Sequence, residues 1–281
     1  MDQAGRLREL VSRRLPEQAR VITIASGKGG VGKTSIAVNL GLTLARQGRR
    51  TLIFDADLGL ANVDILLGLV PRYSLQQVIS GQRRLEEVIL RGPCDLLLVP
   101  GASGARELAD LDLQTRDRLL EELAALAAGL DIILVDCGAG ISRTVFSFAA
   151  AAGEVLVVTT PEPPAITDAY GLIKGLHRFQ VQMHLLVNQA ANRVEGQQAA
   201  ARLQGACRRF LQLELPLLGI IPEDAHVGQA VRAQQPLCIV YPRCPAVRAL
   251  EEVAARLQGQ QAPPAAQQQG FWQRLGRFLG R

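Results

Sequence analysis

The feature that most constrains the fold is a glycine-rich segment between an apolar run and a helical pattern. The segment is GKGGVGKT, residues 27–34. It follows the apolar run VITIAS at 21–26 and precedes a helical pattern that extends from Lys33 to about Gln47. A second apolar run, TLIFDAD, comes next at 51–57. Strand, glycine loop, helix and strand in this order predict a βαβ unit, in which the two strands are parallel.

The same alternation continues along the chain. Apolar runs typical of buried strands recur at 95–99, 131–136, 154–160, 182–188 and 217–221. Helical patterns separate them near 115–128, 142–152, 165–177 and 195–211. Such alternation predicts an α/β fold, a doubly wound, mostly parallel sheet with helices on both faces. With 281 residues, 48% of them hydrophobic, the chain suits one such domain.

The glycine loop admits two interpretations. A dinucleotide-binding G-x-G-x-x-G pattern is met by Gly27, Gly29 and Gly32. Asp55, which ends the next strand, supplies the acid that such a site uses. The loop also satisfies G-x-x-x-x-G-K-[ST], in which backbone amides cradle phosphates, Lys33 reaches the β- and γ-phosphates and Thr34 binds Mg2+. Because a dinucleotide site needs neither Lys33 nor Thr34, the pattern favours a nucleoside triphosphate and a P-loop NTPase fold.

Acidic residues close two of the predicted strands beside this loop. Asp136 ends ILVD and can hold the water shell of a metal ion. Asp55 and Asp57 lie at the mouth of the second strand, where they can bind Mg2+ through water and orient a water molecule. An N-cap is the simpler role for Asp57. Gly138 and Gly140 allow backbone amides to approach the γ-phosphate, or else only turn the chain.

Lys28 narrows the class, because KGGVGKT with this early lysine resembles the signature of the MinD/ParA family of deviant Walker A ATPases. Two of the chain's three lysines lie in this loop. The resemblance covers about residues 20–255, including the segments at 55–68, 159–174 and 221–230. It implies a slow, regulatory ATP hydrolase that uses ATP and Mg2+ and forms a homodimer when ATP is bound.

The resemblance also implies roles for single residues. Lys28 crosses the dimer interface to the partner's phosphates, Asp57 positions the attacking water and Asp136 belongs to the Walker B strand. Asn188 reads adenine, with a loop cap as the simpler alternative. The predicted catalytic residues are Lys28, Lys33 and Asp57. The predicted nucleotide-binding residues are Gly27, Lys28, Gly29, Gly30, Val31, Gly32, Lys33, Thr34, Ser35, Asp136, Gly138 and Asn188. The predicted Mg2+ site comprises Thr34, Asp55 and Asp136, the carboxylates acting through water.

Two segments are most similar to one group within this family, the FlhG (FleN) regulators of flagellar number. They are DLGLANVDILLG at 57–68 and the N-terminal DQAGRLRELV. In that group a DQAxxLR element stimulates FlhF, a GTPase of the signal-recognition-particle type. We therefore predict an activator helix at 1–19 ahead of an ATPase domain at 20–257, with a frayed, solvated helix as the alternative. The residues that match the element are Asp2, Gln3, Ala4, Leu7 and Arg8. The resemblance further implies flagellar partners, either C-ring proteins or a transcription regulator.

The C-terminal end has a different composition. Residues 258–270 are rich in Gln, Ala and Pro and predict a flexible linker. Residues 271–281 place apolar side chains on one helical face and arginines on the other, which predicts a basic amphipathic helix. The resemblance implies a reversible anchor to anionic lipid at the inner face of the cell membrane, in a cytoplasmic protein. Docking on the protein's own surface is the alternative. The predicted membrane contacts are Phe271, Trp272, Leu275, Phe278 and Leu279.

Composition argues against several other classes. No apolar run approaches the ~18 residues of a transmembrane helix. Five cysteines form no C-x-x-C pair, and Cys137 has no evident partner, which disfavours a metal framework and an iron–sulfur ATPase. Three charges of the net +5 come from the last eleven residues, so we expect no direct binding of nucleic acid. A ParA-type DNA-segregation ATPase, a septum-site MinD ATPase and a switch with negligible hydrolysis stay open as alternatives.

Overall fold

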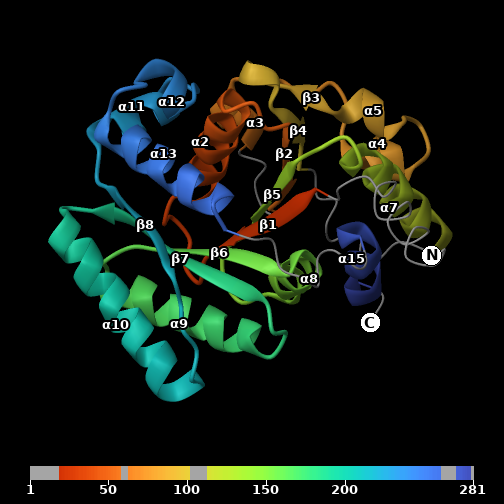
Figure 1. Ribbon diagram of the computed structural model, residues 1–281. Helices are drawn as coiled ribbons and strands as arrows, with labels where there is room; N and C mark the ends of the chain where they lie inside the picture. Colours follow the sequence, from red (N-terminus) through yellow and green to blue (C-terminus); the bar gives the residue numbers. More distant parts are fainter. Residues whose placement is uncertain (1–18, 58–62, 102–112, 261–269, 280–281) are drawn as a thin grey trace, which may run out of the picture.

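The computed structural model describes residues 19–57, 63–101, 113–260 and 270–279 (Figure 1). The predicted activator helix lies outside the described residues, as do its Asp2, Gln3, Ala4, Leu7 and Arg8. So does most of the predicted linker. The predicted division of the chain into an activator helix, an ATPase domain, a linker and a tail therefore stays a prediction.

Eight strands form one sheet in the described part of the chain. They are β1 (Arg20–Ala25), β2 (Thr51–Ala56), β3 (Leu90–Arg91), β4 (Leu97–Val99), β5 (Ile132–Cys137), β6 (Glu154–Thr159), β7 (Gln182–Ala190) and β8 (Leu217–Pro222). The helices before β6 are α2 (Lys33–Arg46), α3 (Val63–Leu67), α4 (Leu75–Ile79), α5 (Leu85–Val88), α7 (Leu113–Ala127) and α8 (Arg143–Ala152), with a 3-10 turn, η1 (Pro93–Asp95). Those that follow are α9 (Pro163–His177), α10 (Arg193–Leu211), α11 (Ala225–Arg232), α12 (Leu237–Val240), α13 (Pro245–Gln258) and α15 (Phe271–Leu279).

The sheet is mostly parallel, as the sequence predicts. Its strand order is β3-β4-β2-β5-β1-β6-β7-β8, and only the pair β3–β4 is antiparallel among the pairs described. β1 lies near the centre, between β5 and β6. The carboxyl ends of the parallel strands therefore meet at one edge, which is where the glycine loop leaves β1.

Helices cover both faces of this sheet (Figure 1). α2 and α13 pack together on one face, whereas α7 to α10 and α15 lie on the other. Side chains of β2 alternate between the two apolar clusters, since Leu52 and Phe54 join the α7–α10 side and Ile53 joins the α2 side. Burying each such side chain contributes about 1.5–3 kcal/mol. The doubly wound arrangement predicted from the sequence is confirmed.

Some details differ from the sequence prediction, which placed neither the helices α3, α4 and α5 nor the short strand β3. The strand predicted at 95–99 begins at Leu97, because Cys94 and Asp95 take left-handed backbone angles, φ 57° and 58°, in the turn η1. After β8 the structure adds α11, α12 and α13, although the apolar pattern did not single out helices there.

A buried ion pair fastens the amino end of the sheet. Arg20 donates from Nε and Nη2 to the carboxylate of Glu154 at 2.8 and 2.7 Å. Its Nη1 also donates to the backbone carbonyls of Leu257 and Gln260, at 2.6 and 3.0 Å. One guanidinium at the start of β1 thus binds the start of β6 and the end of α13.

The C-terminal helix α15 docks on the domain. It packs against α7 and α8, and Phe271, Trp272 and Leu275 are buried. The Trp272 ring lies 5.3 Å from that of Phe54 on β2, and the Phe278 ring lies 6.0 Å from that of Phe179. In this structure the predicted membrane-binding face is thus turned toward the protein, which is the alternative that the sequence left open. The side chain of Leu279 is outside the description, and none of the described helices is long and apolar enough to cross a membrane.

Candidate functional site

The glycine loop joins the end of β1 to the start of α2. Gly30 and Gly32 have φ angles of 77° and 88°, in the left-handed region that side chains disfavour. Gly32 is also the N-cap residue of α2. The loop therefore ends at a helix N-terminus, whose unpaired N–H groups and dipole favour a bound anion.

Neighbouring elements hold the loop in shape. A Cβ atom on Gly27 would collide with the backbone carbonyl of Asp168 in α9, so only glycine fits. Asn188, near the end of β7, donates from Nδ2 to the carbonyl oxygen of Val31 at 2.8 Å. A Cβ on Gly32 would lie 2.5 Å from that same Nδ2. α9 and β7 thus hold the glycine loop in a fixed shape.

Three carboxylates gather at the same edge of the sheet. Asp55 and Asp136 are register partners on β2 and β5, and both are buried. Asp57 follows β2, and its backbone N–H donates to Oδ1 of Asp55 at 3.1 Å. The Thr34 hydroxyl lies close enough to Asp136 to lower the pKa of that carboxyl. A Cβ on Gly138 would come within 3.1 Å of Asp57 Oδ1, so the chain after β5 passes close to this carboxylate.

The pair Asp55–Asp136 is electrostatically strained. Burial, and then the charge of Asp136, raise the pKa of Asp55 to about 7, against the hydrogen bond from the Asp57 backbone. Burial also raises the pKa of Asp136 to about 6, although the Thr34 hydroxyl and the Lys33 ammonium lower it. Two ionised carboxylates in this place therefore cost folding free energy at neutral pH, and a cation between them would recover it.

These residues fit a Mg2+ ion. Asp55 Oδ2 and Asp136 Oδ1 are buried and have no hydrogen-bond partner. Mg2+ usually binds one or two carboxylates together with water and substrate phosphates. The described residues contain no group of three or more His, Cys, Asp or Glu side chains that could enclose a metal. Phosphates and water would therefore complete the coordination beside Thr34.

The two lysines of the loop point to different partners. Lys33 is buried and close enough to Asp136 to lower its pKa. Lys28 is exposed, and its Nζ donates at 2.7 Å to Oε2 of Glu162, the N-cap residue of α9. An exposed pair of this kind contributes about 0–1 kcal/mol. Lys28 can consequently exchange Glu162 for another anion at little cost.

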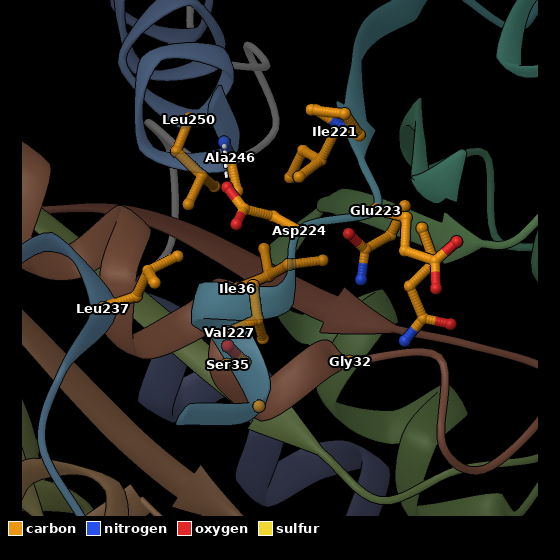
Figure 2. A pocket seen from close by; sticks show the side chains of 14 residues that line it. Gly32, Ser35, Ile36, Ile221, Glu223, Asp224, Val227, Leu237, Ala246 and Leu250 are labelled. Carbon is orange, nitrogen blue, oxygen red and sulfur yellow. Dashed lines mark hydrogen bonds between the residues drawn. The ribbon is translucent and has the colours of Figure 1, made fainter. Parts of the chain in front are cut away.

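A cavity of about 380 Å³ opens beside the loop (Figure 2). It lies between the start of α2, the end of β7 and the segment from β8 to α11, with α13 behind. Asp224 caps α11 through the N–H of His226 and also accepts from the N–H of Ala246, so its oxygens are already engaged. Apolar side chains from five elements supply the remaining walls; they include Ile36, Ile221, Val227, Leu237 and Leu250. The size and mixed lining suit a nucleoside base next to a phosphate site.

The structure thus brings together the residues that the sequence predicted for the loop, the metal and the water. Asn188 lines the cavity, but its Nδ2 holds the loop, so its position also agrees with the loop-cap alternative. Sequence reasoning missed Glu162 as the partner of Lys28, because an exposed ion pair leaves no periodic signal. It also missed the cavity walls Val227, Leu237 and Leu250, which only the fold brings together.

Known proteins resemble this chain over most of its length. The sequence profile described as "CobQ/CobB/MinD/ParA nucleotide binding domain" matches residues 22–237. The antiactivator FleN of Pseudomonas aeruginosa is 42% identical, over 91% of this chain and 93% of its own length. The flagellum site-determining protein YlxH of Helicobacter pylori is 33% identical, over 99% of both chains. Among solved structures, the septum site-determining protein MinD of Pyrococcus horikoshii, complexed with Mg-ADP, has a TM-score of 0.69 and 27% identity, over 85% of this chain and 96% of its own.

Proposed function

Since the chain belongs to the family of CobQ/CobB/MinD/ParA nucleotide-binding domains, we propose that it is a slow MgATP-dependent ATPase switch that regulates flagellar number or placement. The observation that carries the ATPase part is the preformed phosphate loop facing two unsatisfied carboxylate oxygens. The relatives FleN and YlxH, by their names an antiactivator and a flagellum site-determining protein, support the flagellar part.

Each residue of the site has a role in this proposal. Lys33 and the amides of the loop bind the β- and γ-phosphates. Thr34, Asp55 and Asp136 hold Mg2+, which neutralises phosphate charge when bound. Asp57 accepts a hydrogen bond from the attacking water and aligns it with the γ-phosphorus. The base occupies the cavity beside Asn188.

The switch itself depends on Lys28. In the proposed ATP-bound homodimer, Lys28 leaves Glu162 and neutralises phosphate charge in the partner's site. Two facing triphosphates concentrate negative charge, so one cation from each side stabilises the pair. Because the pair with Glu162 is exposed, leaving it costs little compared with binding a triphosphate.

Sedimentation tests this dimer. Wild type, Lys28→Ala and the matched control Lys174→Ala are each run with ADP and with ATP plus Mg2+. We expect a dimer only with ATP, lost in Lys28→Ala and kept in Lys174→Ala, because Lys174 lies on α9 away from the loop. A monomer in all conditions, despite ATP binding, would overturn the role of Lys28 and leave the phosphate cradle in place.

The proposal places the protein in the cytoplasm and, when dimeric, at the inner face of the cell membrane. The docked tail α15 leaves its groove on dimerisation and inserts its apolar face into anionic lipid, and two tails bind more firmly than one. Residues 1–19 stimulate an FlhF-type GTPase, and C-ring proteins or a flagellar transcription regulator are further partners. Equal binding to liposomes with ADP and with ATP would count against the release of the tail. An unchanged GTPase rate on adding the chain would count against the activator.

A further inference from the structure

Positive charge is concentrated in one layer of the molecule. Between Ala169 and Leu213 the sequence has six Lys or Arg residues and one acidic residue, Glu195. With the bordering acids Asp168 and Glu214 also counted, the stretch keeps an excess of three positive charges, out of a net +5 for the whole chain. The small overall charge therefore conceals a basic region, which comprises most of α9 and α10 and the strand between them.

Four basic side chains of this region face solvent. They are Lys174, Arg178, Arg202 and Arg209, and all are exposed. Among the described residues none of them forms an ion pair with an acid, whereas Arg208 pairs with Glu214. The helix dipole favours cations in a last turn, which accounts for Lys174 and Arg209. It does not account for Arg202, in the middle of α10. Arg178 is the C-cap residue of α9, and its guanidinium also lies over the rings of Phe146 and Phe179.

An exposed aromatic ring lies among these charges. The side chain of Phe210 is 64% exposed, and the Arg209 guanidinium lies 5.2 Å above its ring. Its other edge meets Tyr170 of α9, at 6.5 Å between ring centroids. An exposed phenylalanine flanked by arginines is typical of surfaces that enter the interface of a bilayer.

The same surface continues to the docked tail. α8, α9, α10 and α15 lie on one face of the sheet (Figure 1). Phe278 of α15 packs against Phe179, and the Arg178 guanidinium covers that ring at 4.7 Å. The Arg178 end of the basic layer therefore lies next to the docked tail.

We propose that the α9–α10 basic surface, defined as Lys174, Arg178, Arg202, Arg209 and Phe210, is a second, preformed contact for an anionic lipid bilayer. It attracts and orients the protein before the tail inserts, and it adds to the affinity afterwards. The inference rests on the proposed membrane binding, but it assigns a part of that binding to the folded domain.

A bilayer fits this surface better than nucleic acid does. The surface is formed by two helices lying side by side, with a single exposed ring rather than a series of rings on which successive bases could stack. Its border is the tail, whose own pattern is that of a lipid-binding helix.

The test compares two variants of equal net charge. Lys174→Glu/Arg202→Glu/Arg209→Glu reverses the basic surface without touching α15. Arg84→Glu/Arg243→Glu/Arg248→Glu reverses three exposed arginines elsewhere. Each full-length protein is sedimented with phosphatidylcholine vesicles with and without phosphatidylglycerol, in ATP plus Mg2+. Trp272 is the only tryptophan in the chain, so its quenching by brominated lipid separately reports insertion of the tail.

We expect the basic-surface variant to bind anionic vesicles roughly 10- to 100-fold more weakly than wild type, and the control variant to change by less than about 3-fold. Wild-type binding should weaken with salt. Equal binding by the two variants, with Trp272 still quenched, would overturn this inference and leave the proposed tail anchor intact. If the basic-surface variant loses vesicle binding and bound wild type shows no quenching of Trp272, the tail anchor is overturned and the basic surface is supported. A selective loss of binding to duplex DNA, with vesicle binding unchanged, would assign the surface to nucleic acid and overturn the inference.

Discussion

The glycine loop and the tail groove, which is the docking site of α15 against α7 and α8, differ in what fills them. The loop is held by Asn188 and α9, yet the neighbouring Asp55 and Asp136 keep unsatisfied buried oxygens. The groove between α7 and α8 is filled by the chain's own Trp272. One region is complete only with a ligand from outside, and the other only while a segment of the same chain stays in place. If the proposed nucleotide and membrane binding hold, the nucleotide would fill an incomplete site, whereas the membrane would compete with a contact that is already made.

The largest effect should come from the loop. Lys33→Ala removes the only buried cation beside Asp136 that the structure describes, so we expect ATP hydrolysis to fall by roughly 100-fold or more. Folding should persist, because the contacts with Asn188 and with the backbone of Asp168 that hold the loop do not involve the Lys33 side chain. Hydrolysis and Trp272 fluorescence are measured on this variant and on Lys174→Ala. If hydrolysis survives, the loop is not the phosphate site.

The next largest effect should come from the carboxylates of Asp55 and Asp136, and it concerns the stability of the protein. Their raised pKa values mean that the folded protein holds more protons than the unfolded chain between pH 4 and 7. Without nucleotide, stability should therefore fall as pH rises through this range. Asp55→Asn should stabilise the nucleotide-free protein by about 1–3 kcal/mol at pH 8, and by little at pH 4. Urea denaturation at both pH values measures this, and Asp131→Asn, at an exposed ion pair, is the control.

Truncating a side chain of the tail should destabilise the protein less than truncating one in the core. Phe148→Ala, in the centre of the domain, should cost about 3–5 kcal/mol. Trp272→Ala should cost only ~1–2 kcal/mol, because undocking of α15 limits the loss and Trp272 Nε1 has no hydrogen-bond partner among the described residues. Equal costs for the two variants would mean that the tail is a permanent part of the core.

The smallest effect should come from Glu162. Glu162→Gln frees Lys28 from its ion pair, and we expect the ATP-dependent dimer to form a few-fold more readily, which corresponds to less than ~1 kcal/mol. Sedimentation equilibrium over a range of protein concentrations measures this. Glu195→Gln, on α10, is a control that leaves the pair untouched. A weaker dimer in Glu162→Gln would mean that Glu162 contributes to the interface instead.

The sequence was sufficient to predict features that depend on residues close together in the chain. Two apolar runs of strand length, with a glycine loop and a helical pattern between them, predict the βαβ unit. The acids at the strand ends lie close together because parallel strands end at one edge of the sheet. The sequence could not decide where α15 lies, because the same amphipathic face fits lipid or the groove beside Phe54 equally well. Nor could it show that Lys174 and Arg209, which are 35 positions apart, belong to one surface. Total charge hides such grouping, which depends on the packing of α9 against α10.

The ion pair and hydrogen bonds of the Arg20 guanidinium have a mechanical consequence. The first strand of the sheet begins at Arg20, and the C-terminal segment of the chain follows Gln260. The Arg20 guanidinium binds the backbone carbonyl of Gln260 and the buried carboxylate of Glu154. Force applied to the C-terminal segment would therefore reach the sheet first at the amino ends of β1 and β6. The glycine loop lies at the opposite, carboxyl edge of the sheet.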